Sequence, residues 1–184
     1  MILVLLAPLA ACQRSEESAF RDAIGPPMAR DAHHERALAA LIFEDGSVAP
    51  KAGMLPSGSA DRHLAEVEQS LRSGRRGAAL ESAAQAVVAA PERPRALERL
   101  GHVLRRLGRA EQAAAAFRTA LRHDGNDAAA AAGLAWLASG AGDWPEAVDR
   151  WRRVLELAPD HPDAQGRLAA AAYFNGDSAA AREA

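Results

Sequence analysis

The segment from Pro94 to Asp127 reads PRALERLGHVLRRLGRAEQAAAAFRTALRHDGND and has two apolar stripes at helical spacing. The leucines of its first half recur three and four residues apart, at Leu97, Leu100, Leu104 and Leu107. That spacing places them on one face of an α-helix. Gly108 follows directly and predicts the end of this helix.

The second half of the segment predicts another helix, whose apolar side is built mostly from small residues. The stripe consists of Ala113, Ala116, Phe117, Ala120 and Leu121, and Gly125 ends it. Small side chains at Gly101, Ala113 and Ala120 allow two helices to approach closely, while Phe117 is large enough to fill the gap between them. The segment is therefore predicted to be a helix, a tight turn and a second helix.

This unit recurs along the chain with a period of 34 residues, which three independent series support. The glycine series is Gly74, Gly108, Gly142 and Gly176. A series at the ends of the units is Pro91, Gly125 and Pro159, and an alanine series is Ala79, Ala113, Ala147 and Ala181. Repetition at a fixed period of this length is the signature of a repeat solenoid.

The unit resembles the tetratricopeptide repeat (TPR), whose pattern is Leu-Gly on the first helix, a turn glycine, then Ala, large aromatic and Ala on the second. In 94–127 these are Leu100-Gly101, Gly108, Ala113, Phe117 and Ala120; in the next unit they include Leu134-Ala135, Gly142, Ala147 and Trp151. The resemblance covers residues 60–184 in units 60–93, 94–127, 128–161 and an incomplete 162–184. It implies an all-α, TPR-like α-solenoid of about 3.5 helix-turn-helix repeats after an extended N-terminal tether.

The two outer units depart from the pattern. In 60–93, Glu66 and Val67 stand where Leu-Gly is usual, as terminal repeats often show. The last unit stops at Ala184, inside its second-helix pattern. We therefore expect either that the natural chain continues beyond Ala184 or that a partner packs against this end.

Residues 1–11 carry no charged side chain and end in Leu9-Ala10-Ala11-Cys12. The run is shorter than the roughly 20 residues of a membrane-spanning helix and has the length of a signal-peptide core. Leu9 to Cys12 resembles the lipobox of bacterial lipoproteins, although no basic residue precedes the apolar run. The resemblance implies lipidation of Cys12 and a protein anchored on the periplasmic side of a bacterial membrane. Gln13, which is not an acidic retention residue, favours the outer membrane.

The stretch 12–59, between the anchor and the repeats, is predicted to be a linker. Pro26-Pro27 interrupts any helix there. Residues 31–43 can form one short amphipathic helix, whose apolar side would hold Ala37, Leu38, Leu41 and Ile42. Glycines and prolines from 44 to 59 predict a loop.

Composition excludes several classes of function. The formal net charge is −2, from 22 basic and 24 acidic residues, so electrostatics favours no nucleic-acid partner.

Adjacent His33 and His34 point about 100° apart on a helix and are a poor metal pair. No hydrolase, phosphate-loop or metalloprotease motif occurs in the sequence. We expect no enzyme activity, no cofactor and no metal.

The resemblance to TPR proteins implies a concave groove lined by the first helices, in which a protein or peptide binds. The family's contact positions fall on Arg95, Glu98, His102, Arg105, Arg106, Ala132, Trp136 and Tyr173. This groove would be basic at one end and apolar at the other, and would suit an acidic segment beside apolar side chains. Arg105 and Arg106 could equally be a solvated helix face, and Trp136 could equally belong to the core between repeats.

The sequence favours a lipoprotein scaffold or assembly factor of the bacterial cell envelope, of the pilus, secretion or outer-membrane assembly type. Two alternatives stay open. One is a permanent accessory subunit of a larger envelope or electron-transfer complex. The other is a regulatory TPR fragment of a longer envelope enzyme.

Overall fold

The computed structural model describes residues 32–55 and 57–177. These form one short helix, a β-hairpin and seven longer helices. Their bounds are α2 Ala32–Leu38, β1 Leu41–Glu44, β2 Ser47–Pro50, α3 Ala60–Arg72, α4 Arg76–Ala89, α5 Pro94–Arg106, α6 Ala110–His123, α7 Ala128–Ala141, α8 Trp144–Leu157 and α9 Ala164–Phe174. The predicted lipobox with Cys12, and Ala181 of the last unit, lie outside the described residues.

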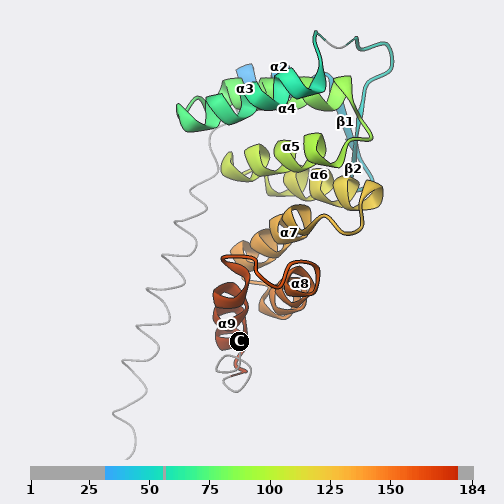
Figure 1. The fold of residues 1–184 in the computed structure, drawn as a ribbon. Coiled ribbons are helices and arrows are strands. Elements are labelled where there is room, and N and C mark those ends of the chain that lie inside the picture. Colours follow the sequence, from blue (N-terminus) through green and yellow to red (C-terminus); the bar gives the residue numbers. More distant parts are fainter. Residues whose placement is uncertain (1–31, 56, 178–184) are drawn as a thin grey trace, which may run out of the picture.

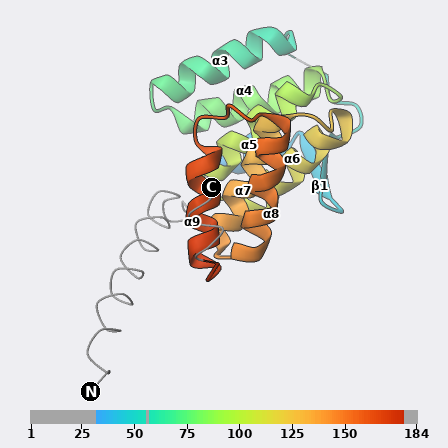
Figure 2. The same ribbon diagram turned by 60° about the horizontal axis from the view of Figure 1, so that its bottom comes forward.

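The helices pair as antiparallel hairpins, α3 with α4, α5 with α6 and α7 with α8, and α9 packs on α8. Figure 1 shows these hairpins stacked in chain order, and Figure 2 shows α9 lying alongside α7 and α8. First helices contact the first helices of the next repeat, as α3 does α5 and α5 does α7. The predicted all-α repeat solenoid is confirmed.

The glycines of the 34-residue series are at the turns within the units. Gly74, Gly108, Gly142 and Gly176 have φ angles of 72°, 71°, 75° and 83°. A side chain in this left-handed region is strained, and glycine is not. The period therefore marks a conformational requirement that is repeated once in every unit.

Two aromatic side chains fill the interior. Phe117 and Trp151 are both fully buried, in the positions where the repeat pattern predicted a large aromatic residue. Phe117 belongs to a core that extends from the N-terminal hairpin to Leu134. Trp151 belongs to a second core formed by α7, α8 and α9.

The prediction for residues 31–43 is wrong beyond Leu38. The helix ends there, Leu41 and Ile42 belong to strand β1, and part of the predicted loop forms strand β2. The strands pair antiparallel around Asp45-Gly46, which have φ angles of 50° and 69°. An Asp-Gly pair between short apolar runs is a strong signal for a two-residue hairpin turn. Leu41 and Val48, one from each strand, are buried in the same core as the repeats and thereby hold the hairpin against them.

In the described part of the N-terminal segment, residues 32–50 pack mainly on the second helices of the repeats. Helix α2 contacts α4, and β2 contacts α4 and α6. The Val48 N–H donates to Thr119 Oγ1 of α6 at 3.0 Å, and Arg109 Nη2 pairs with Glu35 Oε1 at 2.7 Å. Residues 32–50 therefore leave the face formed by the first helices largely open.

Candidate functional site

The polar face of α5 is the centre of the candidate groove. Arg95, Glu98, His102 and Arg105 are spaced three and four residues apart, which brings them to one side of the helix. Leu97, Leu100 and Leu104 are buried on the other side. The same periodicity that anchors α5 in the core thus presents these polar groups toward the neighbouring first helices.

A hollow of about 490 Å³ lies between α3 and α5, on the side of the first helices. Its lining is Glu68, Leu71, Arg72, Arg99, His102, Arg105 and Arg106. Four arginines and one histidine therefore line the hollow together with one carboxylate and one leucine. This composition gives the hollow a positive potential that attracts anionic groups.

Part of the positive charge is already neutralised within the protein. Arg99 Nε pairs with Glu68 Oε1 at 3.0 Å, and His102 Nε2 lies 3.3 Å from Glu98 Oε1. Burial raises the pKa of the Glu98 carboxyl, but the hydrogen bond from His102 and the charge of Arg99 outweigh it, so that the pKa is lowered overall. Glu98 is only 8% exposed. It therefore positions His102 and Arg99 and offers little surface to a partner.

Arg105 is different from Arg99, because no acid among the described residues forms an ion pair with it, and its Nε is buried without a hydrogen-bond partner. Burial lowers the pKa of the Arg105 guanidinium, and the charges of Arg106 and Arg167 lower it further. The guanidinium carbon lies 5.3 Å from the centre of the Trp136 ring on α7. Arg105 thus joins the basic hollow to the next first helix.

Trp136 belongs both to the core between repeats and to the candidate groove. Its ring meets the buried Trp151 edge-on, with centroids 6.0 Å apart, so one side belongs to the second core. Its half-buried remainder contacts Arg105, and the guanidinium carbon of Arg167 on α9 lies 3.9 Å from the ring centre. Arginine over an indole face is a favourable cation–π arrangement. The indole therefore links the core to the groove.

The remaining predicted groove residues fall in three different environments. Arg95 and Arg106 are exposed, as a solvated face or a binding surface requires. Ala132 is 5% exposed and belongs to the second core, so it offers little surface to a partner. Tyr173 is 39% exposed and contacts Phe174, which stacks on Trp144 with centroids 4.7 Å apart.

Arg167 is the site residue that the sequence prediction missed. It does not fall on one of the repeat positions used to choose groove residues. Its approach to Trp136 depends on how α9 packs against α7 and α8. One indication of Arg167 was present in the sequence: it is a basic residue on the first helix of the unit 162–184, which follows the unit of Trp136.

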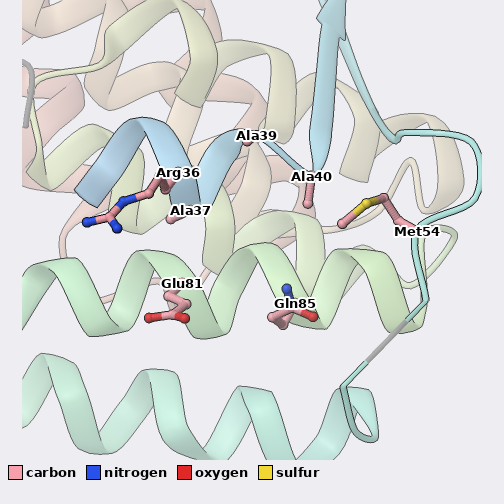
Figure 3. Close-up of a pocket in the computed structure, with 7 residues that line it drawn as sticks. All are labelled: Arg36, Ala37, Ala39, Ala40, Met54, Glu81 and Gln85. Carbon is pink, nitrogen blue, oxygen red and sulfur yellow. The ribbon is translucent and has the colours of Figure 1, made fainter. Parts of the chain in front are cut away.

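A second hollow, of about 450 Å³, lies between α2, α4 and the segment after β2 (Figure 3). Its lining is Arg36, Ala37, Ala39, Ala40, Met54, Glu81 and Gln85. This lining contains one acidic and one basic residue, so the hollow has no excess of either charge. This hollow marks the junction between the N-terminal segment and the second helices.

Ser57, His63 and Glu66 form a row with the residue types of a hydrolase triad. His63 Nε2 lies 3.4 Å from Ser57 Oγ, and His63 Nδ1 lies 3.0 Å from Glu66 Oε2. The Ser57 hydroxyl, however, donates its one proton to Gln85 Oε1. A nucleophilic serine must instead give that proton to the histidine. The row therefore secures the loop before α3 to α3 and α4.

Within residues 32–55 and 57–177, no group of three or more metal-ligating side chains comes together. The helices of this same part of the chain are all too short or too polar to cross a bilayer.

The comparisons with known proteins identify the class to which these repeats belong. The tetratricopeptide repeat family model matches residues 64–131 and 132–184, so the chain belongs to the tetratricopeptide repeat family. None of the curated proteins matches the sequence significantly.

Several solved structures share the fold. One is the first TPR of Spaghetti (RPAP3) bound to an HSP90 peptide, at 17% identity and a TM-score of 0.62, covering 68% of this chain and 99% of that one. Another is MamA, at 17% identity and a TM-score of 0.63, covering 93% and 87%. A third is YrrB, described as a TPR protein with an unusual peptide-binding site, at 18% identity and a TM-score of 0.57, covering 94% and 78%. At these identities the likeness concerns the fold.

Proposed function

We propose that this TPR protein is a membrane-anchored scaffold or assembly factor of the bacterial cell envelope, which holds an acidic segment of a partner protein in the groove of its first helices. The observation that carries the proposal is the basic hollow between α3 and α5, continued by Arg105 to Trp136. Arginine binds carboxylates through paired hydrogen bonds, and tryptophan contributes strongly to binding at interfaces.

The position of the N-terminal segment supports this use of the groove. Helix α2 and the hairpin pack on the second helices, whereas the hollow lies between the first helices α3 and α5. A lipid on Cys12 would hold the protein at the membrane. The lipobox-like sequence 9–12 is the basis for the anchor and for the periplasmic location.

The partner is sought by purifying the tagged full-length protein from gently solubilised membranes and identifying co-purifying proteins by mass spectrometry. The expected result is an envelope protein in stoichiometric amount, retained less well by a variant carrying Arg105→Glu and Arg106→Glu. Recovery of the chain alone would contradict the scaffold role. Retention through extended washing would instead favour the permanent-subunit alternative.

The anchor is tested separately with Cys12→Ala. This variant should leave the membrane fraction while its melting temperature stays that of the parent, because residue 12 lies outside the repeats. Unchanged membrane association of Cys12→Ala would overturn the lipid anchor and leave the groove unaffected.

A further inference from the structure

Three side chains from three successive first helices meet at one point of the groove. Arg105 comes from α5, Trp136 from α7 and Arg167 from α9. The guanidinium carbons of the two arginines lie 5.3 Å and 3.9 Å from the centre of the Trp136 ring. Two positive groups are thus gathered on one aromatic ring.

Arg105 carries most of the electrostatic cost of this arrangement, because Arg167 also has the negative charge of Asp163 nearby. The two guanidiniums have the same charge, and burial removes part of the water that would screen Arg105. Its buried Nε has no hydrogen-bond partner, and a buried donor without an acceptor costs stability. Among the residues that the structure describes, no acid forms an ion pair with Arg105, whereas Arg99 on the same helix pairs with Glu68.

A bound anion would remove each of these costs. A carboxylate beside Arg105 would accept hydrogen bonds from its guanidinium and offset its charge, and Arg167 would add a second positive group at the same ring. The Trp136 ring would hold the arginines in place, so that little side-chain freedom is lost on binding. The adjoining hollow, which Arg72, His102 and Arg106 also line, has room for a second acidic side chain.

We propose that Arg105, Trp136 and Arg167 form a subsite for an aspartate or glutamate side chain of a protein segment, and that the hollow between α3 and α5 takes a second acidic side chain of the same segment. This inference rests on the proposed function and specifies which chemistry the groove recognises. It gives a ligand-binding role to Arg167, which the sequence prediction did not include.

The probe is the blocked peptide acetyl-Leu-Glu-Glu-Leu-Glu-amide, and its control is the same peptide with glutamine in place of each glutamate. Binding to the full chain is measured by calorimetry and by the NMR signal of the Trp136 indole N–H. The glutamate peptide should bind and shift this signal, while the glutamine peptide should bind at least about tenfold more weakly.

The variants are Arg105→Gln and Arg167→Gln, with Arg153→Gln as the matched control. Arg153 lies on a second helix, is more than half exposed and pairs with Glu156 at 2.8 Å. Each groove variant should weaken the glutamate peptide by about tenfold or more, and Arg153→Gln should not. Arg105→Gln should melt close to the parent, because it removes both a repulsion and a favourable contact with the Trp136 ring, and this separates lost binding from lost folding.

Equal binding of the two peptides, or undiminished binding by both groove variants, would overturn the subsite. A single-stranded oligonucleotide that binds the groove more tightly than the glutamate peptide would also overturn it. The proposed function fails separately: if the peptide binds as expected but no envelope protein co-purifies, the subsite stands and the scaffold role falls. If an envelope partner is retained equally by both groove variants, the scaffold role stands and the subsite falls.

Discussion

The Phe117 ring of α6 lies against Gly101 of α5 so closely that a β-carbon at residue 101 would be 2.6 Å from its Cε1. Gly133 of α7 meets the same ring from the next repeat. The ring is fully buried. It is therefore held between two glycines from successive first helices, and neither position has space for a side chain.

Gly101→Ala should destabilise the protein by about 2 kcal/mol, because overpacking of the ring outweighs the better helix propensity of alanine. The measurement is chemical denaturation followed by circular dichroism. Gly166→Ala is the control, because a β-carbon there meets nothing within 4 Å. This control should be unchanged or up to about 1 kcal/mol more stable. Equal effects at the two glycines would contradict the packing argument.

Trp151→Ala should cost about 3–5 kcal/mol, the usual loss when a buried aromatic side chain is truncated. Trp151 is fully buried, and its Nε1 donates to Ser139 Oγ at 3.0 Å. Ser139→Ala should cost about 1–3 kcal/mol, because it leaves the indole N–H without an acceptor in the core. Thermal melting of both variants tests this order. A Trp151→Ala protein that melts like the parent would show that the assignment of this residue to the core is wrong.

Thr119→Val should loosen the N-terminal hairpin without unfolding the repeats. Thr119 Oγ1 accepts from the Val48 N–H at 3.0 Å and donates to the Ala115 carbonyl at 2.8 Å. Valine keeps the shape but removes the acceptor, which should cost about 1–3 kcal/mol. Amide hydrogen exchange should become faster at Val48, while Thr119→Ser should keep the slow exchange of the parent. No change in exchange at Val48 would refute this attachment.

The stability of the protein should fall on acidification, partly through Glu98. The pKa of this carboxyl is lowered in the folded protein from an ordinary value of 4.5. Its ionised form therefore stabilises the fold above pH 4.5, and this contribution is lost as the pH falls through the lowered pKa. Thermal melts of the parent and of Glu98→Gln, taken between pH 7 and about pH 3, measure the difference. The variant should lose less stability across this range; parallel curves would exclude a contribution from Glu98.

Much of the repeat architecture could be predicted from local pattern. Gly74, Gly108 and Gly142 recur every 34 residues because each turn needs a positive φ angle. Phe117 was expected inside because its helix has an apolar stripe, and Trp151 because it stands at the buried aromatic position of the TPR pattern; both are fully buried. The hairpin at Asp45-Gly46 also had a local signal, the turn pair itself, but the helical spacing of the apolar residues beside it favoured the wrong structure.

The candidate site was predictable only in part, because it forms across separate helices. The contact positions of the TPR family placed Arg105 and His102 in the groove. Those positions could not show that Glu98 is almost buried, or that Ala132 lies in the core.

The sequence by itself determined the repeat, its turns and its core residues, since those follow from backbone conformation and apolar periodicity within about 34 residues. Only the tertiary structure decided that Arg105 and Arg167, 62 positions apart, approach the same Trp136 ring. It also decided that the hairpin covers the second helices and leaves the first helices open. Both depend on the angles at which whole helices stack, and these angles are set by side-chain packing between repeats.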